Sequence, residues 1–306
     1  MAEFEIIKKL TSILSISDKD VLIGFGDDCA CVNVNGKKLL FTADIQVENR
    51  HFVRNKINPI DLGWKLVSVN VSDIVACGGI PRWGLISIAV PKSIEISFLE
   101  EVYNGINEAK NFYKLEIIGG NTSSADEIIF DLFLTGETEK FISRSNAEEG
   151  DLIFISGYTG LSRAGLEILL QDIKNLEDFE KELLKYHTRP VARIDIQERI
   201  QKYANSCIDI SDGLVADLGH ISQMSNKKIV LENIPISPLL EKFAKKYSKD
   251  PLEYTLYGGE DYQLAFTVSK ENAKYFKDCL KIGHIEEGKG IYLQDVPLKI
   301  KGFEHL

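Results

Sequence analysis

Hydrophobic positions in the first half of the chain alternate between short runs and helical stripes. The short runs are typical of buried strands, and they cover residues 21–23, 38–42, 85–90, 115–118 and 128–134. Asn58 and Pro59 predict the start of a helix, because Asn caps helices and Pro favours the first helical position. We expect this helix to end at the glycine pair 78–79. A capping box of Ser97 and Glu100 predicts a second helix.

The same alternation continues through the second half of the chain. Strands are expected at residues 152–155, 207–210, 228–232, 262–268 and 281–285. Helices are expected at residues 161–171, 190–203 and 213–224. The polar stretch 137–150 is the expected boundary between an N-terminal domain, residues 1–137, and a C-terminal domain, residues 138–306. The pattern therefore predicts two α/β domains.

Acidic residues are concentrated where the expected strands and helices end. They are Asp27-Asp28, Asp44, Asp73, Asp209, Asp212 and Glu260-Asp261. Most have Gly, Ser or Thr beside them, and carboxylates in such junctions are typical ligands of hard divalent cations. Asp73 falls in the last turn of its helix, where the helix dipole disfavours an anion unless a cation compensates. The pattern favours a magnesium site that serves phosphate chemistry.

Each acidic motif also has an ordinary structural interpretation. The aspartates after Gly26 can be solvated residues of a tight turn. Ser211 or Asp212 can be the cap of the helix that follows. Asp217, farther along that helix, is expected at the surface, and so is each histidine except His51, which follows Asp44 in a polar segment.

Two nucleotide-binding patterns are excluded. Gly283 to Lys289 has the spacing of a Walker A loop, but Gly290 replaces the required Ser or Thr. Residues 291–293 read as a strand, whereas a P-loop must open a helix. Cys29 occupies the third glycine position of a dinucleotide-binding pattern, so this pattern is excluded as well. No Ser-His-Asp or Cys-His arrangement for nucleophilic catalysis is evident either.

Charge and composition narrow the function classes. The 306 residues include 46 acidic and 36 basic side chains, a net charge of −10, which argues against nucleic acid as a partner. An acidic site would repel phosphate substrates unless metal ions lie between them. No apolar run approaches the roughly 18 residues of a membrane span, and the N-terminus has no signal-peptide pattern. The 5 cysteines have no metal-site spacing, so a reduced, cytoplasmic protein is expected.

Taken in order, the motifs resemble the thiamine-monophosphate kinase family, within the aminoimidazole ribonucleotide synthetase-like superfamily. The motifs that carry the resemblance are GDDCA at 26–30, TAD at 42–44, NRHF at 49–52, VNVSDIVACGGIPRW at 69–83, IIGGNTS at 117–123, SRS at 143–145, GLSRAGL at 160–166, DISDGLVADLGHI at 209–221 and LYGGEDYQLAFT at 256–267. Each motif is weak alone, but the ordered set covers nearly the whole chain and is specific.

The resemblance implies an α/β fold of two domains, in which the N-terminal mixed sheets of two subunits form a barrel across a homodimer. The C-terminal domain would be an α/β sandwich, and the active site would lie in the cleft between the domains. The implied reaction is transfer of the γ-phosphoryl group of ATP to thiamine monophosphate, with several Mg²⁺ ions as cofactors. Neither nucleic acid nor membrane is an expected partner.

The resemblance also assigns roles to individual residues. The implied magnesium-site residues are Asp27, Thr42, Ala43, Asp44, Asp73, Asn121, Asp209 and Asp212. The implied ATP contacts are Tyr103, Gly120, Asn121, Arg144 and Ser211. The implied thiamine monophosphate contacts are His51, Glu260 and Phe303. Asp212 and Arg144 are the expected catalytic residues.

Two positions depart from the family pattern. Asn121 stands where many relatives carry Asp, so one magnesium ligand is neutral or lost. Phe303 stands where Trp is common, and it retains an aromatic ring that can stack on the substrate.

Four alternatives to the kinase share parts of this pattern. A selenophosphate synthetase would need a reactive cysteine in an N-terminal glycine-rich loop, and none is present. A hydrogenase-maturation relative would end in a cysteine-bearing tail, which the chain lacks. Analysis of the reaction products distinguishes the kinase from a cyclo-ligase of the superfamily and from a non-catalytic metal or nucleotide sensor.

Overall fold

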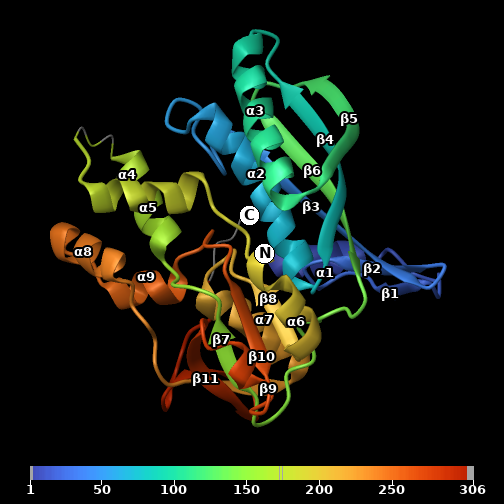
Figure 1. The fold of residues 1–306 in the computed structure, drawn as a ribbon, viewed down its shortest axis with the longest axis vertical. Helices are drawn as coiled ribbons and strands as arrows, with labels where there is room; N and C mark the ends of the chain where they lie inside the picture. The colour runs from blue at the N-terminus through green and yellow to red at the C-terminus, as the bar shows by residue number, and fades with distance from the viewer. Residues whose placement is uncertain (1–2, 172, 174, 302–306) are drawn as a thin grey trace.

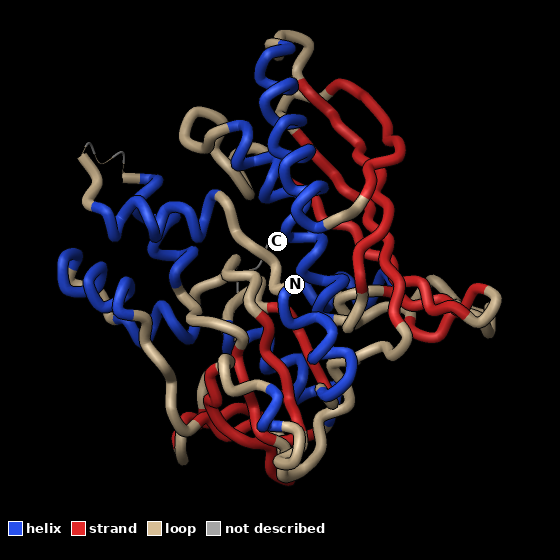
Figure 2. The backbone as a smooth tube through the Cα atoms, in the orientation of Figure 1, coloured by secondary structure: helices blue, strands red, loops and turns tan. Residues whose placement is uncertain are grey.

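A mixed α/β fold with two sheets is the architecture of the protein (Figure 1). The computed structural model describes residues 3–171, 173 and 175–301. The two sheets lie at opposite ends of the view in Figure 1, with helices between and beside them, as the colouring of Figure 2 makes plain. The alternation of strands and helices that the sequence predicts is thus confirmed.

The N-terminal sheet has the strand order β1-β2-β3-β6-β4-β5. Its strands are β1 (Val21–Ile23), β2 (Ala30–Val34), β3 (Lys37–Val47), β4 (Ile80–Val90), β5 (Glu116–Ser124) and β6 (Ile129–Thr138). Helices α2 (Pro59–Ala76) and α3 (Ile96–Tyr113) pack against each other, and α2 contacts β3, β6 and β4. Helix α1 (Glu3–Thr11) precedes the sheet. One face of the sheet is therefore covered by α2.

Helix α2 begins and ends where the sequence predicts. The Asn58 side chain accepts a hydrogen bond from the Ile60 N–H at 2.9 Å, and Pro59 is the first helical residue. After Ala76 the chain turns at Gly78, whose φ of 73° lies in the left-handed region that favours glycine. Nearly every side chain of α2 is buried, so the helix runs through the interior of the protein.

Strand register decides which N-terminal side chains share a face of the sheet. Residues paired across neighbouring strands point to the same face, and one such row is Ile45, Asp131, Ser87 and Asn121. Asp44 is next to Ile45 in β3, so it points to the opposite face, the one that α2 covers. Asn121 and Asp44 therefore lie on different faces of one sheet.

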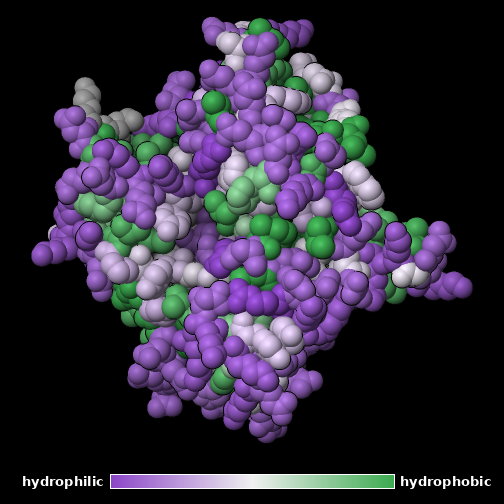
Figure 3. Space-filling view, in the orientation of Figure 1, coloured by the Kyte–Doolittle hydropathy of each residue, from purple (hydrophilic) through white to green (hydrophobic). Residues whose placement is uncertain are grey.

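The face that carries Asn121 is open and partly apolar. Ile45, Trp83 and Leu85 on this face have exposed fractions of 44%, 44% and 41%. Hydrophobic side chains are visible along the edge of this sheet in the space-filling view (Figure 3). Exposed apolar sheet faces are typical of interaction surfaces.

The C-terminal sheet has the strand order β13-β12-β9-β11-β7-β10-β8. Its strands are β7 (Leu152–Ile155), β8 (Ser206–Asp209), β9 (Lys227–Leu231), β10 (Leu264–Val268), β11 (Leu280–Glu287), β12 (Gly290–Leu293) and β13 (Val296–Pro297). Helix α7 (Leu214–Ser225) packs on β8, β9 and β12. The core that contains α2 continues to Cys207 and Phe266 in this sheet, so the two sheets share one hydrophobic core.

The remaining helices form a group beside the C-terminal sheet. They are α4 (Leu161–Leu170), α5 (Asp178–Thr188), α8 (Pro238–Tyr247) and α9 (Pro251–Tyr257). Their shared apolar cluster includes Leu161, Leu183 and Phe243. Short 3₁₀ turns occur at η1 (Ile194–Ile196) and η2 (Ala273–Tyr275), and α6 (Gln197–Tyr203) follows η1.

Two predictions about helices were wrong. Ser97 and Glu100 form no capping box, because α3 already begins at Ile96 after Glu95, without a side-chain cap. The helix predicted from residue 190 is confined to η1 and α6, because tertiary contacts hold the preceding backbone. Trp64 Nε1 donates to the carbonyl of Pro190 at 2.6 Å, and the hydroxyl of Tyr113 accepts from the Ala192 N–H at 2.9 Å.

Two further predictions can be compared with the structure. The strand expected at residues 115–118 is longer than predicted, because β5 continues through Gly119, Gly120 and Asn121 to Ser124 as the edge strand of the sheet. Rejection of the Walker A pattern is confirmed, since Gly283 lies within β11 and residues 290–293 form β12.

Candidate active site

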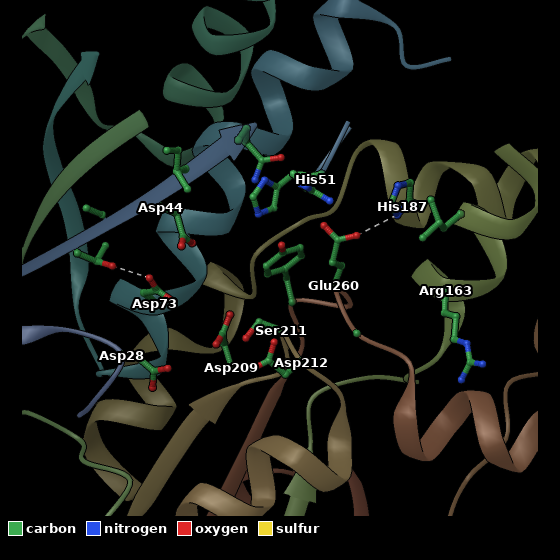
Figure 4. Close-up of a pocket in the computed structure, with 18 of the residues that line it drawn as sticks. Asp28, Asp44, His51, Asp73, Arg163, His187, Asp209, Ser211, Asp212 and Glu260 are labelled. Atoms are coloured by element: carbon green, nitrogen blue, oxygen red, sulfur yellow. Dashed lines mark hydrogen bonds and ion pairs between the residues drawn. The ribbon is translucent and has the colours of Figure 1, made fainter. Parts of the chain in front are cut away.

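One large cavity, of about 950 Å³, collects most of the residues that the sequence singles out. Its lining includes Asp27, Asp28, Thr42, Ala43, Asp44, His51, Asp73, Arg144, Arg163, His187, Asp209, Ser211, Asp212, Glu260 and Tyr262. In Figure 4 the labelled aspartates gather toward one end of the cavity, and Glu260, His187 and Arg163 lie toward the other. Segments far apart in the sequence therefore meet at one concave surface.

The aspartates are brought together by α2, β3 and β8. Thr42 Oγ1 on β3 donates to Asp73 Oδ2 on α2 at 2.5 Å. Ser72 Oγ, the preceding residue of α2, donates to Asp209 Oδ2 at the end of β8 at 2.8 Å. Asn70 Oδ1 of the same helix accepts from the Asp44 N–H at 3.0 Å. The last turns of α2 thus tie the two sheets together at the carboxylates.

The electrostatics of this cluster fit a bound cation. Burial, and then repulsion by Asp44 and Asp209, raises the pKa of Asp73 well above its ordinary value. Burial and the charge of Asp28 likewise raise the pKa of Asp209 well above its ordinary value. Oxygens of Asp28, Asp73 and Asp209 lie within 4.8 Å of one another, and Asp28 Oδ2 is buried without a hydrogen-bond partner among the described residues. Clustered carboxylate oxygens suit Mg²⁺.

Asp73→Asn is expected to stabilise the metal-free protein at pH 8, by about 2 kcal/mol. The pKa of Asp73 is higher in the folded protein than its ordinary value of 3.8. The wild-type protein therefore loses stability as the pH rises from 3.8 through this higher pKa. The neutral variant has no such loss, so its advantage is full at high pH and disappears as pH falls. Urea unfolding in EDTA at pH 8 and at pH 5 measures the difference.

Added Mg²⁺ provides the control for this prediction. Mg²⁺ should stabilise the wild-type protein at pH 8 and should stabilise Asp73→Asn less, because one ligand charge is gone. A variant that is equally or less stable than wild type in EDTA at pH 8 would show that Asp73 is not electrostatically strained.

Arg144 is anchored to the two aspartates that follow Gly26. Its guanidinium forms an ion pair with Asp28, and its Nε lies 3.8 Å from Asp27 Oδ1. Ser143 Oγ donates to Asp27 Oδ2 at 2.6 Å. The SRS segment therefore brings a positive charge directly to the carboxylate cluster, whose net charge would otherwise repel phosphate.

The loop before α7 differs from prediction at Asp217. We expected Asp217 at the surface, but it is only 2% exposed, and its Oδ2 accepts from the N–H groups of Asp212 and Gly213 at 3.2 and 3.0 Å. Gly213 is the N-cap residue of α7, so neither Ser211 nor Asp212 has that position. Asp217 shapes the loop that presents Asp212 to the cavity.

The neighbouring residues Glu260 and Asp261 have different positions in the structure. Asp261 is buried and accepts hydrogen bonds from the N–H groups of Gly160 and Ser162 at 2.5 and 3.0 Å, so it holds the start of α4. Burial raises the pKa of Asp261 to about 7. Glu260 instead lines the cavity. Asp261 therefore has a structural position, although the sequence placed it among the metal candidates.

His51 lies in the cavity wall as the sequence suggests. Its Nδ1 accepts a hydrogen bond from the Val47 N–H at 3.0 Å, which fixes the orientation of the ring. In the neutral imidazole the proton is then on Nε2. The expectation that the other histidines are surface residues was wrong for His187, which is 3% exposed.

Three described residues of the predicted site are not brought to the cavity in this chain. Tyr103 on α3 and the pair Gly120-Asn121 on β5 are exposed and do not line the cavity. Phe303 lies outside the described residues.

Sequence reasoning missed several residues of the cavity region. They are Lys65, Asn70, Ser72, Arg163, His187 and Tyr262. A usable signal existed for Lys65, because a lysine within the apolar stretch from Leu62 to Val69 is expected to be buried and so needs a partner. No helix of the described residues is long and apolar enough to cross a membrane.

Comparisons with known proteins agree with the geometry. Residues 26–138 match the family described as AIR synthase related protein, N-terminal domain. The chain is 49% identical to a thiamine-monophosphate kinase of Aquifex aeolicus, over 92% of each chain. It is 38% identical to that of Buchnera aphidicola from Schizaphis graminum, over 99% of this chain and 98% of the relative.

A solved structure extends the likeness to three dimensions. It is named AaThiL complexed with AMPPCP and TMP, and it is 46% identical to this chain. The superposition has a TM-score of 0.94 and covers 100% of this chain and 97% of the other. The chain therefore belongs to the thiamine-monophosphate kinase family.

Proposed function

We propose that the protein transfers the γ-phosphoryl group of ATP to thiamine monophosphate and releases thiamine diphosphate and ADP. The observation that carries the proposal is the single cavity that joins the aspartate cluster to an end lined by His51, Glu260 and Arg163. The aspartate end suits polyphosphates with metal ions, and the other end has room for an organic acceptor. The related AaThiL structure holds AMPPCP and TMP, which supports this pair of substrates.

The metal site would be built from the carboxylates around α2. Asp27, Asp44, Asp73, Asp209 and Asp212 would hold Mg²⁺, with the oxygens of Thr42 and Ala43 beside them. Mg²⁺ bound there would supply positive charge between the phosphate groups of the two substrates, and charge stabilisation with positioning is most of phosphoryl-transfer catalysis.

Arg144 and His51 would complete the catalytic arrangement. The Arg144 guanidinium, which lies against Asp27 and Asp28, would stabilise negative charge on the transferred group. His51 would orient the acceptor phosphate, and Ser211 would contact the nucleotide. The acceptor has a second pKa near 6, so it is largely deprotonated at neutral pH and needs no strong general base. We infer direct in-line transfer, and a stable phosphoprotein trapped with labelled ATP would contradict it.

We also propose that two copies of the chain form a homodimer through the open face of the N-terminal sheet. Ile45, Trp83 and Leu85 would be buried there, and the two sheets would close into a barrel. The site supports this proposal, because Asn121 is three strand spacings, about 14 Å, from β3 and on the opposite face from Asp44. Gly120, Asn121 and Tyr103 of a second copy would then be the ones that reach the nucleotide.

We propose a domain boundary at residues 137 and 138. It coincides with the end of β6 at Thr138, and residues 139–151 form the connection from the N-terminal sheet to β7. The cavity would lie between the two domains, and relative movement of the domains would be limited by the core that they share.

The deciding experiment measures thiamine diphosphate and ADP formed from ATP, Mg²⁺ and thiamine monophosphate. Free thiamine is the control acceptor, because it lacks the phosphate that His51 is proposed to orient. We expect equal amounts of both products with the monophosphate, and at least about 100-fold less with thiamine. ADP release without thiamine diphosphate would favour a sister activity of the superfamily, and nucleotide binding without ADP release would favour a sensor.

A further inference from the structure

Lys65 is a charged residue in the interior of the protein. It lies in the middle of α2, and its side chain is 0% exposed. Lysines are almost never fully buried unless they are paired. The pairing partner is Glu260, whose Oε1 lies 2.7 Å from Lys65 Nζ. Among the described residues Nζ has no hydrogen bond beyond this ion pair, so the lysine is committed to Glu260.

Glu260 is held on its other side by α5. His187 Nδ1 on α5 lies 3.4 Å from Glu260 Oε2 and 3.1 Å from Ser162 Oγ. Figure 4 marks the contact between Glu260 and His187 at the end of the cavity away from the aspartates. The Glu260 N–H also donates to the Ser211 carbonyl at 2.7 Å, so backbone and side chain are both anchored.

Lys65, Glu260 and His187 differ in their charge. Burial, and then the charge of Lys65, lowers the pKa of His187 to about 3, so the imidazole is neutral. Burial opposes ionisation of Glu260, but the charge of Lys65 lowers its pKa below the ordinary value. With His187 neutral, the 2.7 Å ion pair with Lys65 favours the ionised form of the carboxylate.

Only one member of the Lys65–Glu260 pair faces the cavity. Glu260 lines it with a side chain that is 29% exposed, whereas Lys65 does not line it. Lys65 can therefore affect a ligand only through Glu260. Because an anion in a partly desolvated wall attracts a cation strongly, this end of the cavity suits an organic cation.

Helix α2 also links the two ends of the cavity. Lys65 and Asp73 are eight residues apart in one helix, which corresponds to about 12 Å along its axis. The same buried helix thus positions Glu260 at one end and the aspartate cluster at the other. The distance between the acceptor ring and the reacting phosphates would follow from the rigidity of α2.

We propose that Lys65 is a positioning residue for the acceptor, which fixes the Glu260 carboxylate where it binds the cationic thiazolium and aminopyrimidine rings of thiamine monophosphate. This inference rests on the proposed function, because it names a determinant of acceptor recognition in the same site. Lys65 touches neither substrate, so its removal changes acceptor affinity and leaves the nucleotide end unaffected.

Lys65→Met tests the proposal, because Met keeps the length and apolar stem of the side chain and removes the charge. We expect the KM for thiamine monophosphate to rise about 100-fold, while the KM for ATP stays within about 3-fold of wild type. Glu260→Gln should raise the same KM to a similar extent. The double variant should be no worse than Glu260→Gln alone, because Lys65 acts through Glu260.

Lys110→Met is the matched control, since Lys110 also forms an ion pair, with Glu116 at 3.1 Å, and does not line the cavity. It should leave both KM values unchanged. If Lys65→Met folds poorly, the double variant, which removes both charges, is compared with Glu260→Gln. Equal increases in both KM values, or additive effects in the double variant, would overturn the proposal.

Titration calorimetry separates this inference from the proposed function. If wild-type protein forms no thiamine diphosphate, the proposed kinase activity fails. Binding of thiamine monophosphate to wild type, Lys65→Met and Lys110→Met still reports on Lys65 without turnover. Binding that is equal in all three proteins, or absent from wild type, would overturn the role of Lys65.

Discussion

Asp212→Asn is expected to lower turnover by about 1000-fold or more while the protein stays folded. Asp212 lines the cavity beside Asp209, and Asp217 holds the backbone of its loop. Asn keeps the shape of the side chain but removes the negative charge that a metal ion requires. Steady-state kcat at saturating ATP and thiamine monophosphate measures the loss, and thermal unfolding checks the fold.

A surface aspartate supplies the control for Asp212. Asp178→Asn removes the same charge from a side chain that is 100% exposed, and it should leave kcat unchanged. Activity of Asp212→Asn within a few-fold of wild type would mean that Asp212 serves only the shape of the loop, and the metal assignment would move to the other aspartates.

Leu85→Asp is expected to convert a dimer into a monomer and to lower turnover by about 100-fold. Leu85 is 41% exposed on the open sheet face, so the single chain tolerates a carboxylate there, whereas a closed barrel would have to bury it unpaired. Activity should fall with the dimer, because Asn121 and Tyr103 lie outside the cavity of their own chain. Light scattering after gel filtration should give twice 34.4 kDa for wild type and 34.4 kDa for the variant.

Ile96→Asp is the control for the sheet face. Ile96 is 68% exposed at the start of α3, away from the open face, so the same change should alter neither mass nor activity. A wild-type protein that is monomeric and fully active would refute the dimer. The nucleotide contacts proposed for Gly120 and Asn121 would then be wrong as well.

Local chemistry made a large part of the fold predictable from the sequence. Asn58 and Pro59 placed the start of α2, and the glycine at 78 placed its end, because caps and left-handed turns depend on neighbouring residues alone. The family was predictable for a different reason. The ordered motifs specify a set of side chains whose spacing along the chain is rarely met elsewhere, although none is decisive alone.

Errors arose where specific side-chain contacts overrode local preferences. The sequence predicts Asp217 at the surface, yet backbone N–H groups of the preceding loop donate hydrogen bonds to its carboxylate. The segment after Pro190 looked helical, yet the side chains of Trp64 and Tyr113 bind its backbone. These contacts cannot be identified from the sequence. Trp64 and Tyr113 lie far along the chain from the segment that they bind, and the contacts of Asp217 form through a turn that the pattern does not reveal.

The sequence by itself determined which chemical groups this protein carries, since carboxylates at the ends of strands and helices follow from residue type and local pattern. The tertiary structure decided which groups meet. Strand register put Asp44 and Asn121 on opposite faces of one sheet, because side chains alternate along a strand. The packing of α2 brought Lys65 to Glu260 and Asp73 to Thr42 across long stretches of chain. Such pairings depend on a folded core, which no local pattern encodes.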